Sequence, residues 1–300
     1  MTLKEPFLID DYELIQVIGH GSFSQITLEK NKKNGQLVAM KQFFQQNHDD
    51  LDQADFMREI AILGVIHHPC ITNFYGFSYG DIENPQPKYA MEYFKNGSVE
   101  TMLSHGRTYL TGTQKSIICL GVLSALTYLH ENAIKDGQIL HRDLKPSNIF
   151  LDNDLYPKLG DFGFAKVIYQ PYHHTMFRGS YPWMAPEVML SNNYGTPSDV
   201  YSFGCVLYNL ITGFPPFPNF QTSGEYIEHV GKKGERPILP ELDESLHPII
   251  YSCWEQDPKK RPTFHQILKE FVNCKSLFNN TNLIKFQEYA NSIGYTLFEA

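Results

Sequence analysis

The chain changes character near residue 95, and this change limits the folds that it can adopt. Residues before that point are rich in short β-prone runs bounded by turn residues. Asn34-Gly35 lies between two such runs and is a hairpin signal. The expected strands are 12–18, 24–30, 36–43 and, less sharply bounded, 71–78 and 88–93.

Helical periodicity dominates the remainder of the chain. Before residue 95 a helix is expected only over 52–65, where Phe56, Ile60 and Leu63 recur at helical spacing. After it, 114–131 and 198–212 are long, mostly apolar helical segments. The sequence therefore predicts an α+β fold in which a small β-rich part precedes a larger, mainly helical part, joined near Lys95-Asn96-Gly97.

The segment 18–26, Ile-Gly-His-Gly-Ser-Phe-Ser-Gln-Ile, resembles a glycine loop that grips phosphate, with Ser24 in the place of a third glycine. By itself it fits a nucleotide site, a decayed site or a simple β-turn. A dinucleotide-binding loop needs a helix directly after it, because the helix N-terminus holds the pyrophosphate. Here a strand is expected instead, so that fold is excluded.

Composition excludes several classes of function. The net charge of −8 gives no basic stripe for general nucleic-acid binding, so no nucleic-acid partner is expected. No run approaches the roughly 20 apolar residues of a membrane span, and no signal peptide is expected. The histidine pairs lack the spacing of a zinc site. The cysteines are odd in number and scattered, which is typical of reduced core thiols in a cytoplasmic protein: Cys70, Cys119, Cys205, Cys253 and Cys274.

An ordered set of motifs carries the chemistry. In chain order they are Val38-Ala39-Met40-Lys41, Glu59, His141-Arg142-Asp143-Leu144-Lys145-Pro146-Ser147-Asn148, Asp161-Phe162-Gly163 and Ala185-Pro186-Glu187. Together they resemble the protein kinase family over about residues 12–272. The resemblance implies a bilobal protein kinase fold with an N-lobe of about 12–94 and a C-lobe of about 95–272. Residues 273–300 form a tail of unknown role.

The resemblance implies an ATP site in the N-lobe. Lys41, paired with Glu59, would grip the α- and β-phosphates. The glycine segment would cover the phosphates, and a group of apolar and hinge residues would surround the adenine. The expected nucleotide-binding set is Ile18, Gly19, His20, Gly21, Ser22, Phe23, Ser24, Ile26, Ala39, Lys41, Glu59, Met91, Glu92, Phe94 and Phe150, with Tyr93 in the hinge and Met91 at the back of the pocket.

Phosphoryl transfer demands alignment and charge neutralisation more than covalent chemistry. By resemblance, Asp143 would accept or orient the proton of the attacking hydroxyl, and Lys145 would lie over the transferring group as a cation. Asn148 and Asp161 would supply the oxygen ligands that Mg²⁺ prefers. The implied cofactors are therefore ATP and Mg²⁺.

Further positions match by resemblance. An apolar column would link the two lobes, built from Leu63, Phe74, His141 and Phe162 above Asp199. Glu187 would pair with Arg261 and tie the substrate segment to the helical lobe. The pair of Glu187 and Arg261 favours a protein substrate over a small-molecule substrate.

Lys145-Pro146-Ser147-Asn148 and the Gly179-Ser180 pair resemble serine/threonine kinases, whereas other stretches resemble tyrosine kinases. This mixture is typical of the tyrosine kinase-like group, whose members mostly phosphorylate serine and threonine. Arg142 beside Asp143 implies activation by phosphorylation of the segment between Asp161 and Glu187. Thr175 is the best-placed acceptor, with Tyr169, Tyr172 and Ser180 as alternatives.

The expected function is an ATP-dependent serine/threonine protein kinase. The alternative is a pseudokinase, in which the same fold serves as a nucleotide-binding scaffold. Loss of Lys41, Asp143, Asn148 or Asp161 would indicate the scaffold, and all four are present. Substrate, upstream activator and oligomeric state are not encoded in any recognisable motif.

Overall fold

The computed structural model describes residues 11–21, 24–44, 50–80, 85–104, 110–169, 173–174, 179–273 and 275–297. The chain divides into two compact units. Unit 1 comprises Met1–His67 and Thr72–Lys95, and unit 2 comprises His68–Ile71 and Asn96–Ala300. Each is described separately below.

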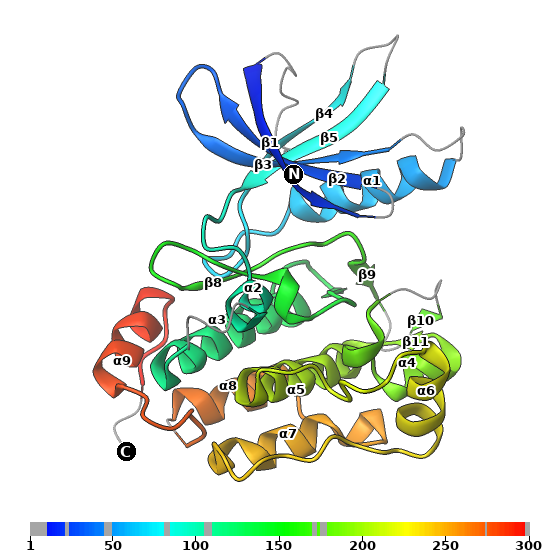
Figure 1. Ribbon diagram of the computed structural model, residues 1–300, viewed down its shortest axis with the longest axis vertical. Coiled ribbons are helices and arrows are strands. Elements are labelled where there is room, and N and C mark those ends of the chain that lie inside the picture. The colour runs from blue at the N-terminus through cyan, green and yellow to red at the C-terminus, as the bar shows by residue number, and fades with distance from the viewer. Residues whose placement is uncertain are drawn as a thin grey trace. The chain divides into compact units, whose positions relative to one another are not determined.

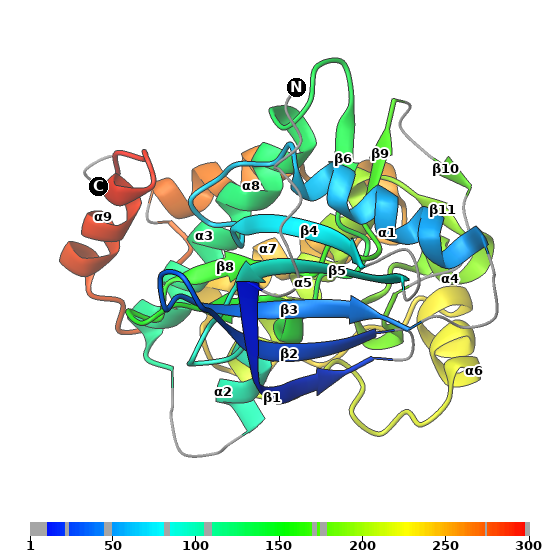
Figure 2. The ribbon, with the colours of Figure 1, turned by 90° about the horizontal axis from the view of Figure 1, so that it is seen from above.

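Unit 1 is built on a five-stranded antiparallel sheet (Figures 1 and 2). Figure 2 shows its strands side by side in the order β1-β2-β3-β5-β4. Asn34-Gly35 lies in the connection between the second and third strands, with Gly35 at a φ of 75°, as a tight turn of this kind requires. The strands are β1 (Tyr12–His20), β2 (Ser24–Asn31), β3 (Leu37–Phe43), β4 (Phe74–Gly80) and β5 (Pro85–Glu92).

Helix α1 (Asp50–Leu63) packs on one face of this sheet. Its side chain Phe56 is fully buried and meets Phe43 of β3 and Tyr79 of β4 edge to face, with ring centroids 5.3 and 5.8 Å apart. Such pairs add to the free energy gained by burial alone. The apolar positions that predicted this helix are thus the ones that attach it to the sheet.

Unit 2 is mainly helical and carries three two-stranded sheets. Its α-helices are α2 (Val99–Ser104), α3 (Gly112–Glu131), α4 (Pro186–Ser191), α5 (Thr196–Thr212), α6 (Ser223–Glu225), α7 (His247–Cys253), α8 (Phe264–Val272) and α9 (Leu283–Ser292). Short 3₁₀ segments are η2 (Pro146–Asn148), η3 (Tyr181–Trp183), η5 (Glu244–Leu246) and η6 (Pro258–Lys260), and η4 (Tyr226–Lys232) is a π-helix.

The core of unit 2 surrounds α3 and α5. Residues on almost every face of α3 are buried, which agrees with its nearly uniform apolar sequence. The helix starts at Thr111, whose side chain accepts a hydrogen bond from the Gln114 N–H while Gln114 reaches back to the Thr111 backbone. Directly after α5, Gly213 caps the helix with a φ of 78°, a conformation that favours glycine.

The short sheets pair β6 (Gln138–Leu140) with β9 (Lys166–Ile168), β7 (Ile149–Leu151) with β8 (Pro157–Leu159), and β10 (His173–His174) with β11 (Asn193–Tyr194). They hold the loops that carry most of the predicted catalytic residues.

Within the stretch 12–94, the short segment His68–Ile71 is grouped with unit 2. Ile71, expected to begin a strand of the sheet, instead forms a parallel bridge with Leu159 of β8. The Leu159 N–H also donates to the Cys70 carbonyl at 2.8 Å. Strand β4 therefore starts only at Phe74.

His68 is held in the neutral form within this segment. Its Nδ1 accepts a hydrogen bond from the Cys70 N–H at 3.1 Å, so the ring proton lies on Nε2, 3.2 Å from Ser124 Oγ. The ring also stacks on Tyr128. Burial, together with the nearby charge of Lys158, lowers the pKa of His68 from 6.5 to about 4.

This shift predicts a loss of stability in mild acid. Below pH 6.5 the unfolded chain binds a proton at His68 that the folded chain does not accept until about pH 4, so the free energy of unfolding falls as pH falls through this window. We expect a loss of about 1–2 kcal/mol between pH 7.5 and pH 5, allowing for partial exposure. Urea unfolding at both pH values measures it. His68→Gln should remove the difference, exposed His265→Gln should retain it, and an unchanged difference in His68→Gln would contradict the assignment.

Within the described ranges, no helix has the length and apolar character needed to cross a membrane.

Candidate active site

The candidate residues fall into two groups, one in each unit. In unit 1 the glycine segment joins β1 and β2, and the Gly21 N–H donates to the Ser24 carbonyl at 2.7 Å. Neither Gly19 nor Gly21 has a positive φ. A Cβ on Gly19 would meet Ile26 at 3.6 Å, an ordinary contact, so the space around this residue does not require glycine. Ser22 and Phe23 lie outside the described residues.

The register of the sheet aligns the segment with Lys41. Gly19 is opposite Ile26, Ile26 is opposite Lys41, and Lys41 is opposite Tyr89. Paired residues on neighbouring strands share a face. The glycine segment, one expected adenine contact and the expected phosphate-binding lysine therefore lie in one row across the sheet.

Lys41 makes the expected ion pair with Glu59 of α1. The Nζ atom lies 2.9 and 3.1 Å from the two carboxylate oxygens, and both residues are buried. Tyr89 also donates its hydroxyl to Glu59 at 2.6 Å. The sequence analysis missed Tyr89. Side chains alternate between the two faces of a strand, so Tyr89, between Lys88 and Ala90, could have been assigned to the sheet face that α1 covers. No motif marks it, however.

The remaining unit 1 positions lie on or beside the sheet. Ala39 is opposite Met91, and both are buried. Glu92 accepts a hydrogen bond from the Asn73 side chain at 2.8 Å. Phe94 is buried directly after β5. Of the other expected contacts, Ile18 and His20 are exposed on β1, and Leu63 and Phe74 of the predicted column are buried.

In unit 2 the expected catalytic residues form a closed polar triangle. Lys145 Nζ lies 2.8 Å from Asp143 Oδ2 and donates to Ser180 Oγ at 2.8 Å. Ser180 in turn donates to Asp143 Oδ1 at 3.0 Å. Asp143 is buried, whereas Lys145 is partly exposed. Three residues of the catalytic and substrate-side sets thus share one hydrogen-bonded network.

Asn148 and Asp161 are brought together by the β7–β8 hairpin. The Gly160 N–H donates to the Asn148 carbonyl at 2.9 Å, which places Asp161 one residue from that bond. The Asn148 amide nitrogen donates to the Asp143 carbonyl at 2.8 Å and to its carboxylate at 3.2 Å. With the nitrogen so used, the Asn148 side chain offers its oxygen to a ligand.

A buried carboxylate fixes the loop that carries Asp143. Asp199 of α5 accepts the His141 and Arg142 N–H groups, each at 2.9 Å, and pairs with His130 at 2.9 Å. Burial alone would raise the pKa of Asp199, but the His130 hydrogen bond and charge, aided by the backbone donor, outweigh it and lower the pKa. Asp199 therefore stays ionised and acts as an anchor.

Two residues of this region adopt left-handed backbone conformations that side chains disfavour. Arg142 has a φ of 68° and Asp161 a φ of 54°. Residues held in this way cluster at functional sites. Beside them, the rings of His141 and Phe162 meet with centroids 5.2 Å apart, as expected for the lower half of the column, and Phe150 lies on β7.

Gly179 is a position where glycine is required. Its φ is 124°, and a Cβ would come within 3.1 Å of the Arg142 carbonyl. Nearby, the Arg142 guanidinium lies over the Tyr194 ring at 4.1 Å. Tyr194 pairs with His173 of β10. Thr175, the expected phosphorylation site, and Tyr172 lie outside the described residues, whereas Tyr169 is exposed after β9.

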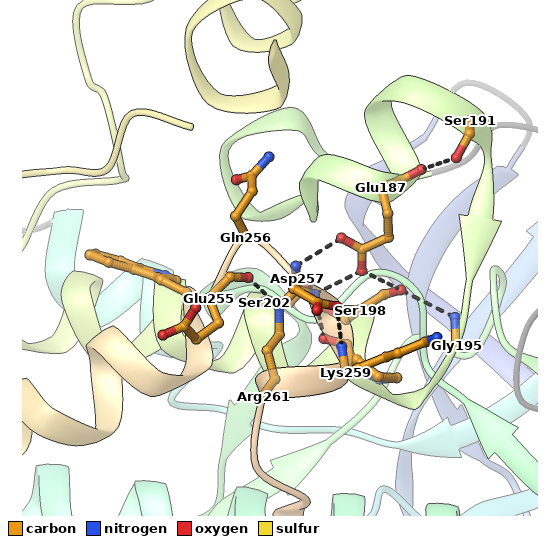
Figure 3. A network of polar contacts seen from close by, with 12 residues as sticks. Glu187, Ser191, Gly195, Ser198, Ser202, Glu255, Gln256, Asp257, Lys259 and Arg261 are labelled. Carbon is orange, nitrogen blue, oxygen red and sulfur yellow. Dashed lines mark hydrogen bonds and ion pairs between the residues drawn. The ribbon is translucent and has the colours of Figure 1, made fainter. Parts of the chain in front are cut away.

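The expected pair of Glu187 and Arg261 is present (Figure 3). Two parallel hydrogen bonds of 2.7 and 2.8 Å join the guanidinium to the carboxylate. Arg261 also donates to the Pro197 carbonyl, and Ser198 donates to Glu187 at 3.3 Å. The Arg261 side chain is fully buried. Such fork-to-fork pairing fixes α4 against the start of α5 and the segment at η6.

Comparison with known proteins agrees with this arrangement. The protein kinase domain family matches residues 12–272. A Dictyostelium discoideum protein described as "Probable serine/threonine-protein kinase nek2" is 31% identical over 89% of this chain and 64% of its own length. "Serine/threonine-protein kinase VIK" of Arabidopsis thaliana is 34% identical over 88% and 60%. "Mitogen-activated protein kinase kinase kinase A" of Dictyostelium discoideum is 29% identical over 85% and 27%. The chain thus spans less than two thirds of the length of each.

Proposed function

Because this chain belongs to the protein kinase family, we propose that it is an active enzyme that transfers the γ-phosphoryl group of ATP to serine and threonine hydroxyls of protein substrates. The observation that carries the proposal is the hydrogen-bonded triangle of Asp143, Lys145 and Ser180. It joins a buried acceptor, a cation and a group of the substrate segment in one place.

Unit 1 supplies residues that would bind the nucleotide. Lys41 would bind the α- and β-phosphates of ATP, and Glu59, which accepts a hydrogen bond from Tyr89, holds the lysine in place. Gly19 and Gly21 carry no side chains, so the backbone at these two positions would allow a phosphate to approach closely. The adenine would lie against Ile18, Ile26, Ala39 and Met91, with backbone groups from Glu92 to Phe94 as its hydrogen-bond partners.

Asn148 and Asp161 fit a magnesium site. Their side chains carry an amide oxygen and a carboxylate, which are hard oxygen donors, and they would hold Mg²⁺ from adjacent ends of one hairpin. When bound, Mg²⁺ neutralises the phosphate charge that develops during transfer.

The chain's own groups then handle the proton. Asp143 would accept the hydrogen bond of the attacking hydroxyl and take its proton as the bond from the hydroxyl oxygen to the γ-phosphorus forms and the bond from the γ-phosphorus to the β–γ bridging oxygen breaks, with ADP as the leaving group. Lys145 stabilises the negative charge of the transferring group at the same time. Ser180, bonded to both, holds the substrate segment in register with Asp143.

The hydroxyl class follows from the same triangle and from the family relatives. Lys145 and Ser180 occupy the positions that the sequence associates with serine/threonine specificity, and the relatives named above are serine/threonine kinases by description. We place the chain in the tyrosine kinase-like group on its mixed motifs. Its kinase domain is taken as 12–272.

Regulation by phosphorylation of the segment between Asp161 and Glu187 is part of this proposal. Arg142 lies on Tyr194, whose strand pairs with β10 two residues before Thr175. A phosphate on Thr175 gains charge-assisted hydrogen bonds from a guanidinium at this position. The four described cysteines are all buried and free, in keeping with a cytoplasmic location.

Phosphoamino-acid analysis tests the hydroxyl class. The purified chain is incubated with Mg²⁺, γ-labelled ATP and a peptide library that contains serine, threonine and tyrosine acceptors. We expect label on serine and threonine only. Label mainly on tyrosine would overturn the specificity, and nucleotide binding without any transfer would indicate the scaffold alternative.

Replacement of Ser24, which stands in the place of a third glycine, should change nucleotide affinity little. Ser24 contributes its backbone carbonyl to the Gly21 N–H, and a side-chain change leaves this bond intact. We expect Ser24→Gly to change the affinity for Mg-ATP by threefold or less, under ~0.7 kcal/mol. Calorimetric titration of both proteins measures the difference. A tenfold gain would mean that the natural loop is compromised and would favour the scaffold.

A further inference from the structure

The segment 275–297 lies beyond the family match yet is packed into unit 2 (Figure 1, red). Its helix α9 contacts α3. Six of its apolar side chains are buried: Leu277, Phe278, Phe286, Tyr289, Ala290 and Leu297. This degree of burial is that of a core element of unit 2.

Directional bonds attach the start of the segment to the rest of unit 2. Ser116 Oγ of α3 accepts the Phe278 N–H at 3.0 Å and lies 2.8 Å from Thr281 Oγ1. The Asn279 N–H donates to the buried Asp243 at 2.6 Å. The segment is therefore held in one position on α3, and its later residues are presented to their neighbours in a fixed way.

Tyr289 of α9 contacts the β7–β8 hairpin. Its ring meets that of Tyr156, the residue directly before β8, with centroids 4.7 Å apart. A Cβ on Gly121 of α3 would lie 2.3 Å from the Tyr289 hydroxyl and 2.4 Å from Pro157, the first residue of β8. Glycine in a helix interior is disfavoured relative to alanine. The close approach of α9 and of the hairpin to the same point of α3 accounts for this glycine.

The Tyr289 hydroxyl reaches the hairpin a second time through Cys70, which also belongs to unit 2. The hydroxyl oxygen and the thiol sulfur lie 3.4 Å apart and share a hydrogen bond. Burial raises the pKa of both groups, that of the thiol to about 11, so both stay protonated. The Cys70 carbonyl accepts the Leu159 N–H at 2.8 Å, and Ile71 bridges to the same Leu159. Cys70 thus joins Tyr289 to the end of β8.

The end of β8 leads directly to the two expected magnesium ligands. Leu159 is its last residue, and the next N–H, that of Gly160, donates to the Asn148 carbonyl at 2.9 Å. Asp161 follows, and Asn148 directly precedes β7. Three residue pairs join β7 to β8, and an isolated two-stranded hairpin is at best marginally stable. The contacts of the hairpin with the rest of unit 2 therefore decide how firmly it holds Asn148 and Asp161.

We propose that the C-terminal segment positions the two expected magnesium ligands, Asn148 and Asp161. Tyr289 fixes β8 through Tyr156 and Cys70, and β8 in turn fixes the hairpin that both ligands adjoin. Tyr289 is a positioning residue, since it acts through the hairpin and takes no part in the reaction itself. The consequence for magnesium rests on the proposed kinase function, whereas the mechanical link from α9 to the hairpin does not.

Hydrogen exchange of the full chain, without nucleotide, tests the mechanical link. Tyr289→Phe removes only the hydroxyl that meets Cys70, and Tyr289→Leu also removes the ring that meets Tyr156. We expect Tyr289→Phe to raise amide exchange about two- to tenfold in a peptide spanning 157–163, because one hydrogen bond that supports β8 is lost. Tyr289→Leu should raise the exchange of this peptide further.

Two controls separate this link from a general loss of stability. A peptide spanning 247–253 of α7 should exchange at the wild-type rate in both Tyr289 variants. Tyr251→Phe, the same chemical change at an exposed tyrosine of α7, should leave the 157–163 peptide unchanged. No rise in 157–163 for the Tyr289 variants, or an equal rise in 247–253, would overturn the proposal.

Equilibrium binding then tests the consequence for magnesium. Wild type and Tyr289→Phe are titrated with ATP in a calorimeter, once with Mg²⁺ and once with a chelator. We expect the variant to bind ATP about two- to tenfold more weakly with Mg²⁺ and within about twofold of wild type with the chelator, because the residues that lose support are metal ligands. Equal weakening in both conditions, or none with Mg²⁺, would overturn the positioning role. If wild type binds ATP equally well in both conditions while exchange follows the expected pattern, the proposed magnesium site fails and the mechanical link stands.

Discussion

Asp143→Asn is expected to lower kcat by about a thousandfold while the affinity for Mg-ATP stays within about threefold of wild type. The amide cannot take the proton of the attacking hydroxyl. It also loses the charge that faces Lys145 at 2.8 Å, although it keeps an oxygen for the Ser180 hydroxyl. Initial rates with a peptide substrate, together with calorimetric titration of Mg-ATP, separate the two quantities.

The control for this variant is Asp154→Asn, at an exposed aspartate in the turn of the β7–β8 hairpin. It makes the same chemical change outside the triangle of Asp143, Lys145 and Ser180 and should leave kcat unaltered. An Asp143→Asn enzyme that keeps more than a tenth of the wild-type rate would show that this carboxylate is not the proton acceptor.

Arg261→Ala is expected to cost about 3–5 kcal/mol of the free energy of unfolding, because it leaves a largely buried carboxylate without its cation. Among the described residues, the hydrogen bond that remains to the Glu187 carboxylate comes from the Ser198 hydroxyl at 3.3 Å. The Pro197 and Glu255 carbonyls would also lose their donor. Urea unfolding followed by circular dichroism measures the change.

Two further variants sharpen this result. Lys260→Ala removes the neighbouring exposed cation and should change stability by no more than about 0.5 kcal/mol. The double variant Glu187→Leu/Arg261→Ala should recover part of the loss, since no charge is then stranded. An Arg261→Ala protein within 1 kcal/mol of wild type would contradict the structural role of the pair.

Local patterns predicted much of the fold. The Asn34-Gly35 turn, the helix around Phe56 and the two long helices of unit 2 were all expected, because strand alternation and helical periodicity are set by neighbours in sequence. Both ion pairs, of Lys41 with Glu59 and of Glu187 with Arg261, were also predicted, but only through resemblance to a family. Spacing alone could not have joined residues so far apart.

The features that the sequence did not predict depend on contacts between residues that are far apart in the chain. Ile71 was assigned to a strand by its β-propensity, yet its bridge to Leu159 takes it into the other unit. Tyr89 matters through Glu59, a partner on a helix. No sequence pattern marked Gly121 of α3, where a Cβ would lie 2.3 Å from the Tyr289 hydroxyl. None of these pairings leaves a periodic or compositional signal.

The central claim is that this chain transfers phosphate from ATP to protein hydroxyls with the help of Mg²⁺. The most direct measurement is transfer of label from γ-labelled ATP by the wild-type chain, with and without Mg²⁺, alongside thermal stability in the same mixtures. The account predicts a Mg-ATP-dependent rise in melting temperature together with label on serine and threonine. The same rise with no label on any acceptor, in phosphorylated and unphosphorylated protein alike, would contradict it.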